Sequence, residues 1–297
     1  MQRMHIKEHC GNILIIIGYI NYWIVLIYKK EKNVMSNSNA SSVIVAQERI
    51  PHFQKDFPLI LFWSQKSGCT SLAHWFFYQI NELKTAFKYH SFIHNYEYEV
   101  YKVAPTYQGK LIKALQKNQK KTYKLVRNPY YRAVSSFVSH IGPPGYQLPQ
   151  WKPIKHFLYN DENIMKGFSF KQYLYYIQHI KKQQDYLDPH IDQQYIPGEE
   201  QFVSNYIYLE RFNMTIRALE MKYNLKKSPL HIITKSWHHQ SDKMVHEGNY
   251  ADVDITDPLF PRLPTYKSFY DNECLQLVYS IFHEDFKVYK YPSVLDN

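Results

Sequence analysis

One segment near the start of the chain, FPLILFWSQKSGCTSLAHWFF at positions 57–77, limits the fold more than any other. Its apolar run LILFW has the length and the aromatic and β-branched content of a buried strand. The polar turn SQKSGCTS follows, and a helix is expected over 70–82. Gly68 allows a sharp turn and the close approach of an anion to the main chain. The segment therefore predicts a strand, a tight turn and a helix in direct succession.

The turn between this strand and helix collects groups that bind anions. A helix N-terminus offers unpaired N–H donors and the positive end of a dipole, and Lys66 adds a full charge. Hydroxyl donors come from Ser67, Thr70 and Ser71. The turn is not a Walker A loop, because no Gly lies five residues before Gly68 and because Lys66 does not directly precede a Ser or Thr that starts the helix. We expect an anion site with another geometry.

A second segment, YKLVRNPYYRAVSSFVSH at 123–140, has a related layout. A strand ends at Arg127, and Pro129 has the fixed φ suited to a first helical position. Two turns into that helix, the hydroxyl of Ser135 can face back toward the strand end. Arginine is the side chain suited to bidentate phosphate contact, and Arg132 offers a second guanidinium. Taken alone, each segment also fits an ordinary strand–helix corner or a surface helix.

Together the two segments resemble the sulfotransferase family. KSGCTS is similar to its 5′-phosphosulfate loop, and RNPYYRAVSS is similar to its 3′-phosphate motif, with a Pro two residues and a Ser eight residues after the Arg. The nearest branch contains carbohydrate 2-O-sulfotransferases and bacterial relatives, whose core ends in Asp-Phe followed by an aromatic. Asp285, Phe286 and Tyr289 repeat that ending, and DPHIDQQ (188–194) and YIYLERF (206–212) resemble its middle. The resemblance spans 57–291.

The resemblance implies transfer of a sulfuryl group from 3′-phosphoadenosine 5′-phosphosulfate (PAPS) to an acceptor hydroxyl, in line and without a metal. It implies a P-loop-like central parallel sheet flanked by helices in a single domain. The residues implied to bind the phosphosulfate are Lys66, Ser67, Gly68, Cys69, Thr70 and Ser71. Arg127 and Ser135, assisted by Arg132, are implied to bind the 3′-phosphate. Lys66 is also implied to stabilise the bridging oxygen, which makes it a catalytic residue.

An acceptor hydroxyl needs a base, and histidine titrates near neutrality. His94 is the first candidate and His90 the second, because both lie between the two cofactor motifs, where the carbohydrate branch keeps its catalytic His. His190 is the next candidate. Glu210 either orients the substrate or has a structural role, and we favour the structural role. The acceptor is expected to belong to a carbohydrate or glycolipid, because aromatic faces suit sugar rings.

The hydrophobic pattern alternates between strands and helices. We expect strands at 59–64, ending at 127, at 206–209 and at 231–234. Helices are expected over 70–82, 109–118, 129–141, 168–184 (capped by Ser169 or Gly167), 214–224 and 272–283, the last of the chain. The segments 87–104, 142–153 and 236–264 are expected to be connections or loops. This order predicts a parallel sheet with helices on both faces and a ligand at the carboxyl ends of the strands.

Composition limits the partners and the compartment. A formal net charge of +10 and a pI near 9.2 favour anionic partners. A nucleic-acid-binding or scaffold protein is one alternative, although no helix-turn-helix, RNP or zinc pattern is present; a P-loop kinase-like transferase is another, although Walker A spacing is missing. Cys10, Cys69 and Cys274 are too few for a disulfide framework and have no metal-ligand spacing, which suits a reducing compartment. For Cys69 we favour the role of a small side chain that packs the turn over that of a nucleophile.

The N-terminal segment 1–34 contains an apolar stretch over 12–28, at the short limit for a membrane span. Its basic flanks favour a cytoplasmic catalytic domain anchored at the membrane; the alternative is a Golgi-type single-pass protein. A third interpretation makes Met35 the true start and 1–34 an over-extended reading frame. Residues 35–56 are expected to form a linker, and 57–297 the sulfotransferase domain.

Overall fold

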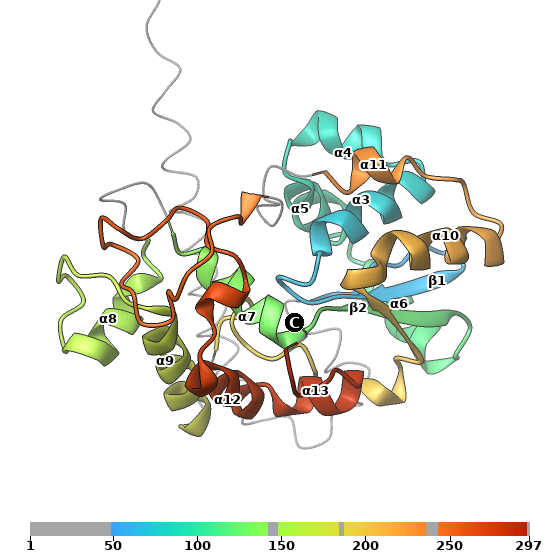
Figure 1. The fold of residues 1–297 in the computed structure, drawn as a ribbon. Helices are drawn as coiled ribbons and strands as arrows, with labels where there is room; N and C mark the ends of the chain where they lie inside the picture. The colour runs from blue at the N-terminus through green and yellow to red at the C-terminus, as the bar shows by residue number, and fades with distance from the viewer. Residues whose placement is uncertain (1–48, 142–147, 184–186, 236–242, 296–297) are drawn as a thin grey trace, which may run out of the picture. The chain divides into compact units, whose positions relative to one another are not determined.

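The computed structural model describes residues 49–141, 148–183, 187–235 and 243–295 (Figure 1). Contacts divide the chain between residues 43 and 44, and every described residue belongs to the second unit, Ile44–Asn297. The expected apolar segment 12–28, most of the linker and Cys10 lie outside the described residues. Within the described ranges, no helix is long and apolar enough to cross a membrane.

A parallel sheet organises the N-terminal part of this unit. Its strands are β1 (Leu59–Phe62), β2 (Lys121–Val126) and β3 (Asn205–Tyr208), in the order β1-β2-β3. Both pairings are parallel, with Leu61 opposite Tyr123 and Tyr123 opposite Asn205. These strands confirm the expected α/β class, and each one matches an expected strand. Their carboxyl ends lead into the segments that begin at Trp63, Arg127 and Leu209.

The two faces of the sheet pack against different helices, as the alternation of side chains along a strand requires. Leu59 and Leu61 belong to a core whose covering helices include α3 (Cys69–Gln79), α10 (Phe212–Lys222) and α11 (Leu230–Ile233). Ile60 and Phe62 belong to the opposite core, covered by α6 (Tyr107–Gln116). Helices therefore lie on both faces, as expected.

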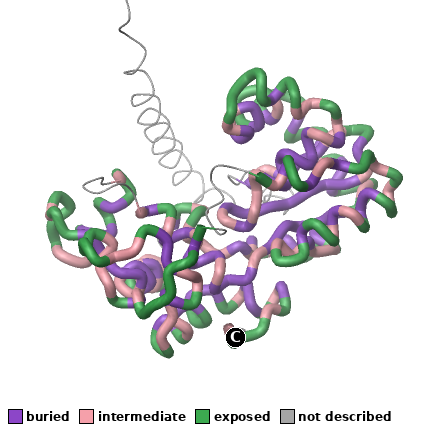
Figure 2. Tube along the Cα trace, turned by 45° about the horizontal axis from the view of Figure 1, so that its top comes forward, coloured by how far each residue is buried: buried purple, intermediate pink, exposed green. Residues whose placement is uncertain are grey.

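A third core lies among helices rather than against the sheet, and all three cores appear as buried stretches in Figure 2. The helices nearest this core are α7 (Pro129–Val138), α8 (Trp151–Tyr159), α9 (Phe170–Lys182), α12 (Asn272–Ile281) and α13 (His283–Tyr289). Ser169 caps α9 through a capping box with Gln172, and Asn128 caps α7 ahead of Pro129. The start of α7 at Pro129 was predicted, and Ser169 was one of the two residues predicted to cap α9, because caps are local signals.

Four expectations about the elements are wrong. The expected strand 231–234 is the helix α11, whose Leu230 and Ile233 pack in the core beside α3. The segment 87–104 is largely helical rather than irregular, and 151–153 already belongs to α8. The helix α12 is not the last, because α13 follows it. The helical stretches near 87–104 are α4 (Leu83–Tyr89), α5 (Ile93–Tyr96) and the π-helix η1 (Glu97–Tyr101). Short 3₁₀ turns complete the elements: η2 (Glu199–Gln201), η3 (Leu209–Arg211) and η5 (Lys267–Phe269).

Candidate functional site

The loop after β1 depends on two left-handed residues. Gly68 has φ 91° and forms the N-cap of α3, while Lys66 has φ 64°. A Cβ at Gly68 would lie 2.6 Å from Cδ1 of Leu209, so only glycine fits without a rearrangement. The buried Ser67 donates from both its hydroxyl and its N–H to the carbonyl of Ser64, at 2.5 and 3.3 Å. Ser67 therefore shapes the loop rather than facing a ligand.

Lys66 is a cation without an acceptor among the described residues. Its side chain is half-buried, and no hydrogen bond or ion pair joins its Nζ to the described part of the chain. Burial lowers the pKa of Lys66 to about 8; the charges of Arg127 and Arg132 also lower it, against Cys69 and Asp188. An anion that arrived beside this ammonium would stabilise its charged form.

Arg127 brings the second sequence motif to this loop. Its guanidinium donates to the carbonyl of Lys66 at 3.0 Å and to the hydroxyl of Tyr266 at 2.7 Å. The same guanidinium lies 5.4 Å from the centre of the Tyr266 ring. The backbone N–H and carbonyl of Arg127 are both hydrogen-bonded to the side chain of Gln194. The segments singled out in the sequence thus meet at the carboxyl ends of β1 and β2.

The two α7 residues expected beside Arg127 have different environments. Arg132 is buried, and it donates to the carbonyl of Gln65 at 2.9 Å and to that of Pro189 at 3.1 Å. Arg132 therefore positions the loop backbone. Ser135 is half-buried and lies one turn after Tyr131, whose ring packs 5.2 Å from Tyr266. Because residues four apart share a helix face, Ser135 is on the side of α7 that faces Tyr266.

His94 lies against the same loop. Its Nε2 is 3.2 Å from Oγ1 of Thr70, and its Nδ1 is 2.6 Å from Oε2 of Glu97. Burial opposes the imidazolium, but the charges of Cys69 and Glu97 outweigh it and raise the pKa of His94 to about 10. In this form both ring nitrogens donate, so the folded protein holds His94 as a hydrogen-bond donor toward the loop.

Glu97 is a site residue that sequence reasoning missed. It is fully buried, pairs with Nζ of Lys102 and with His94, and lies 3.6 Å from Nδ1 of His52. Burial raises the pKa of Glu97, but the charges of Lys102 and His94 outweigh burial and lower the pKa below its ordinary value. The signal was present in the sequence as His94 and Glu97 three residues apart, the spacing that places two side chains together on a helix.

The remaining candidates have hydrogen-bond partners outside the loop after β1. His90 is exposed at the end of α4, where its Nδ1 accepts from the N–H of Phe92 at 2.9 Å. His190 is exposed and pairs with Asp188 at 2.7 Å. Glu210 accepts from the N–H of Asn128 at 2.8 Å and from the hydroxyl of Tyr291 at 3.0 Å, in agreement with a structural role.

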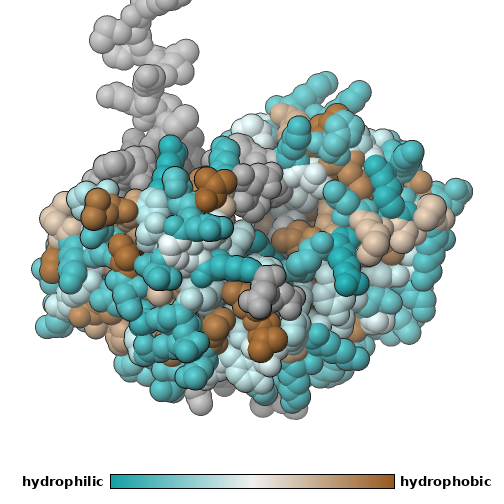
Figure 3. All heavy atoms as spheres, viewed as in Figure 1, coloured by the Kyte–Doolittle hydropathy of each residue, from teal (hydrophilic) through white to brown (hydrophobic). Residues whose placement is uncertain are grey.

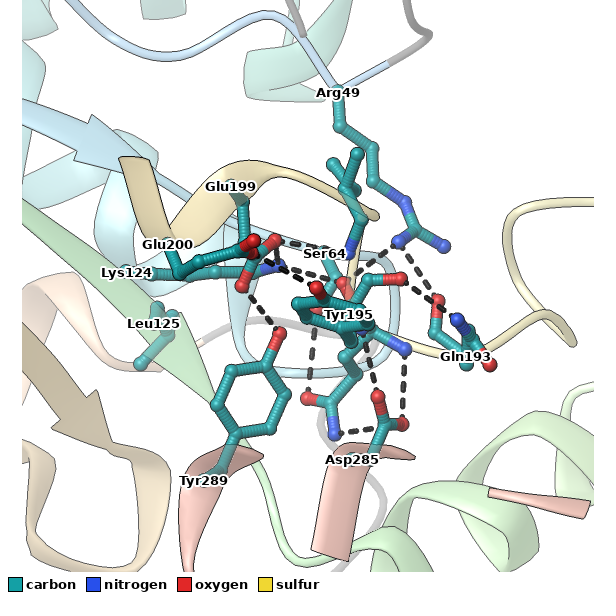
Figure 4. Close-up of polar contacts among 12 residues, drawn as sticks. Arg49, Ser64, Lys124, Leu125, Gln193, Tyr195, Glu199, Glu200, Asp285 and Tyr289 are labelled. Carbon is teal, nitrogen blue, oxygen red and sulfur yellow. Dashed lines mark hydrogen bonds and ion pairs between the residues drawn. The ribbon is translucent and has the colours of Figure 1, made fainter. Parts of the chain in front are cut away.

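A buried polar network connects β2 to the 193–199 segment and to α13 (Figure 4). Lys124 of β2 pairs with Glu199 and donates to the carbonyl of Gln194 at 2.6 Å. Glu199 also accepts from the hydroxyl of Tyr289 at 2.7 Å. Asp285 accepts a hydrogen bond from the N–H of Gln194 at 2.9 Å. The side-chain amide of Gln194 in turn accepts from the N–H of Arg127 and donates to its carbonyl. Asp285 and Tyr289 are the positions that the sequence singled out near the end of the chain.

The surface is hollowed between the sheet-side helices and the helices around α7 and α9 (Figure 3). In the described ranges no group of three or more His, Cys, Asp or Glu side chains could hold a metal ion. Lys66 and Arg127 follow the ends of β1 and β2, and His94 lies against the loop at Thr70. These three cationic groups suit an anion rather than a cation. A scan against models of protein families and searches of curated proteins and of solved structures found no match to this chain.

Proposed function

We propose that this protein is a sulfotransferase that moves a sulfuryl group from PAPS to an acceptor hydroxyl, on the P-loop-like fold of that family. The observation that carries the proposal is the 3.0 Å hydrogen bond from Arg127 to the carbonyl of Lys66. It joins the two cationic strand ends into one site. PAPS carries anionic groups at the 5′ and 3′ positions of a single ribose, so it requires two such subsites side by side.

The loop after β1 supplies the catalytic electrostatics. In an in-line transfer, negative charge grows on the oxygen that leaves with the nucleotide. Lys66 has no competing acceptor among the described residues, and the first N–H groups of α3 add the donors of a helix N-terminus. A single pre-organised donor of this kind typically stabilises a transition state by about 3–4 kcal/mol. Arg127, with Ser135, binds the 3′-phosphate.

His94 has the geometry of an oriented base, because Glu97 holds Nδ1 and leaves Nε2 toward the loop. Its raised pKa makes the neutral form the minor one below pH 10, so a base role predicts a rate that rises with pH. A donor role, in which the imidazolium contacts the transferred group, predicts no such rise. The His94→Gln variant distinguishes them, because it abolishes the rise in the first case only.

Aromatic rings around His94 favour a carbohydrate acceptor. The rings of Phe92 and Tyr98 lie 5.0 and 6.3 Å from that of His94. Tyr98 is exposed, as are Phe87 and Tyr89 on the neighbouring α4. Exposed aromatic faces stack well on sugar rings and offer little to a small charged acceptor. We therefore propose a hydroxyl of a glycan or glycolipid as the acceptor.

The test is thermal melting of the full chain with adenosine 3′,5′-bisphosphate or with Mg-ATP. We expect the bisphosphate alone to raise the melting temperature, since binding to the native state stabilises it by mass action. Stabilisation by Mg-ATP alone would favour a P-loop kinase-like transferase. If neither nucleotide binds and the protein is retained on nucleic acid, the sulfotransferase proposal is wrong. Sulfate transfer from PAPS to a panel of glycans then identifies the acceptor.

A further inference from the structure

Tyr266 lies at the Arg127 end of the candidate site and comes from a distant part of the chain. Its hydroxyl accepts a hydrogen bond from the Arg127 guanidinium at 2.7 Å, and its ring centre lies 5.4 Å from that guanidinium. The half-buried ring also packs against Tyr131 of α7, with 5.2 Å between the ring centres. Because 139 positions separate Tyr266 from Arg127, local sequence order could not identify this aromatic hydroxyl as part of the site.

Both partners have hydrogen-bond donors without an acceptor among the described residues. A guanidinium carries five N–H donors, whereas the described acceptors of the Arg127 side chain are the carbonyl of Lys66 and the hydroxyl of Tyr266. Since the Tyr266 hydroxyl accepts from Arg127, its own hydrogen points elsewhere, and within the described ranges no residue accepts it. Unused N–H and O–H donors side by side, with one full positive charge, suit an anion that accepts from both.

The segment that carries Tyr266 is packed firmly against the helices of the third core. Phe269, three residues further on, is fully buried and lies 5.6 Å from Phe137 between ring centres. Tyr270 donates from its hydroxyl to the carbonyl of Tyr130 at 2.6 Å. Buried contacts of this kind oppose local opening of the backbone. We therefore interpret the Tyr266 hydroxyl as a fixed part of the site rather than as a plug that leaves when a ligand arrives.

We propose that Tyr266 is a specificity-determining residue of the nucleotide site, which donates its hydroxyl hydrogen to the 3′-phosphate while it accepts from Arg127. This inference rests on the proposed function, because it extends the 3′-phosphate subsite assigned to Arg127 and Ser135. A phosphate oxygen that accepts from the guanidinium lies next to the hydroxyl that the same guanidinium already contacts. A nucleotide with a 3′-hydroxyl in place of the phosphate leaves both donors without their anion, so it binds more weakly.

The experiment compares the full wild-type chain with Tyr266→Phe by calorimetric titration. The substitution keeps the ring that packs against Arg127 and Tyr131 and removes only the hydroxyl. We expect affinity for adenosine 3′,5′-bisphosphate to fall about tenfold, the lower end of the range for a hydrogen bond to a charged group, and affinity for adenosine 5′-phosphate to change less than about twofold. Tyr250→Phe is the matched control from the same segment, since its hydroxyl donates weakly to the carbonyl of Glu247 at 3.4 Å, and it should change neither affinity.

A double-mutant cycle with Arg127→Ala tests whether the two side chains bind the same phosphate. If they share one anion, the loss caused by Tyr266→Phe should shrink to about twofold in the Arg127→Ala background. Wild-type affinity in Tyr266→Phe overturns the proposal, and so does an equal loss in both backgrounds. Tighter binding of the bisphosphate by Tyr266→Phe also overturns it, because Tyr266 would then compete with the ligand for Arg127. The stoichiometry of each titration shows whether the variant is folded.

Adenosine 3′-phosphate separates this inference from the proposed function. If the wild-type protein binds it and Tyr266→Phe weakens that binding about tenfold, while a 5′-phosphate adds no affinity, the role of Tyr266 stands and the sulfotransferase proposal fails. If both phosphates of the bisphosphate contribute to binding and Tyr266→Phe has no effect, the sulfotransferase proposal stands and the role of Tyr266 is wrong. If the wild-type protein binds none of the three nucleotides, both are wrong.

Discussion

Lys66 lies in the loop after β1 and Lys124 lies on the neighbouring strand β2, yet the two lysines have different roles. Burial lowers the pKa of both to about 8. Lys124 is fully buried and saturated, since its ammonium pairs with Glu199, donates to the carbonyl of Gln194 and lies 5.4 Å from the centre of the Tyr289 ring. Lys66 is half-buried, has no acceptor in the described part of the chain and has guanidinium neighbours.

The comparison teaches that a shifted pKa does not by itself mark a functional lysine. Burial produces the shift in both cases, and the partners decide its meaning. A lysine whose donors are all used stabilises the fold. A partly buried lysine with unused donors costs stability, and its donors are free to bind a ligand. The predictions below test this division between the two lysines.

The largest effect is expected on stability, from Lys124→Met. The substitution leaves the buried Glu199 without its cation, which typically costs about 3–5 kcal/mol. Unfolding in urea should show the loss as a lower midpoint with an unchanged slope. The double variant Lys124→Met/Glu199→Leu should recover much of it, because no unpaired charge then remains. A loss below about 1 kcal/mol in the single variant would remove the distinction between the two lysines.

The corresponding change in the loop, Lys66→Ala, should act on turnover instead. We expect sulfate transfer to fall by about 10²–10³-fold, which corresponds to about 3–4 kcal/mol for one lost donor to the leaving oxygen. Affinity for the bisphosphate should fall only modestly, and the melting temperature should change little, because no hydrogen bond or ion pair joins the Lys66 ammonium to the described residues. Wild-type turnover in this variant would show that Lys66 is not the catalytic cation.

Arg127 has an intermediate position in the comparison, since part of its guanidinium already holds Lys66 and Tyr266. Arg127→Ala should weaken binding of adenosine 3′,5′-bisphosphate by about 1.5–3 kcal/mol, the usual range for a charged hydrogen bond. Adenosine 5′-phosphate should be affected far less. Calorimetric titration of both ligands checks this, with the exposed Arg211→Ala as control. Equal weakening of the two ligands contradicts a role at the 3′-phosphate.

The smallest effect concerns pH. Lys66 loses its charge as pH rises through its pKa of about 8, so its contribution is complete below that value and declines above it. The kcat/KM for the nucleotide should therefore be about tenfold lower at pH 9 than well below pH 8, if the charge of Lys66 alone limits it. Lys66→Arg keeps its charge throughout this range and should remove the decline, at whatever activity it retains. A decline that persists in Lys66→Arg assigns the titration to another group.

The parts of the fold that sequence predicted are those with local causes. The strand–turn–helix at 59–79 and the capped helices α7 and α9 follow from Gly68, Pro129 and Ser169, whose conformational preferences act on their own neighbours. The strand expected at 231–234 was wrong because a short apolar run has no period long enough to distinguish strand from helix. Packing beside α3 decided in favour of the helix.

The residues of the candidate site also divide into those with local causes and those that depend on packing. Local sequence order alone identified the strand-end residues Lys66 and Arg127, because parallel strands bring their carboxyl ends to one edge. It could not choose between His90 and His94, which differ only in which one faces the loop. That choice depends on Glu97, buried against Lys102 and His52, and on how the helices after α3 fold back over the sheet.

The sequence by itself determined the α/β class, the left-handed turn at Gly68 and the residues that end β1 and β2, since these depend on contacts a few positions apart. Only the tertiary structure decided which lysine is saturated and which histidine meets the loop. Lys124 is saturated by Glu199, 75 positions away in the sequence, and His94 meets Thr70, 24 positions away. Burial makes such distant partners strong, because a charge removed from water is stabilised only by the groups that it contacts.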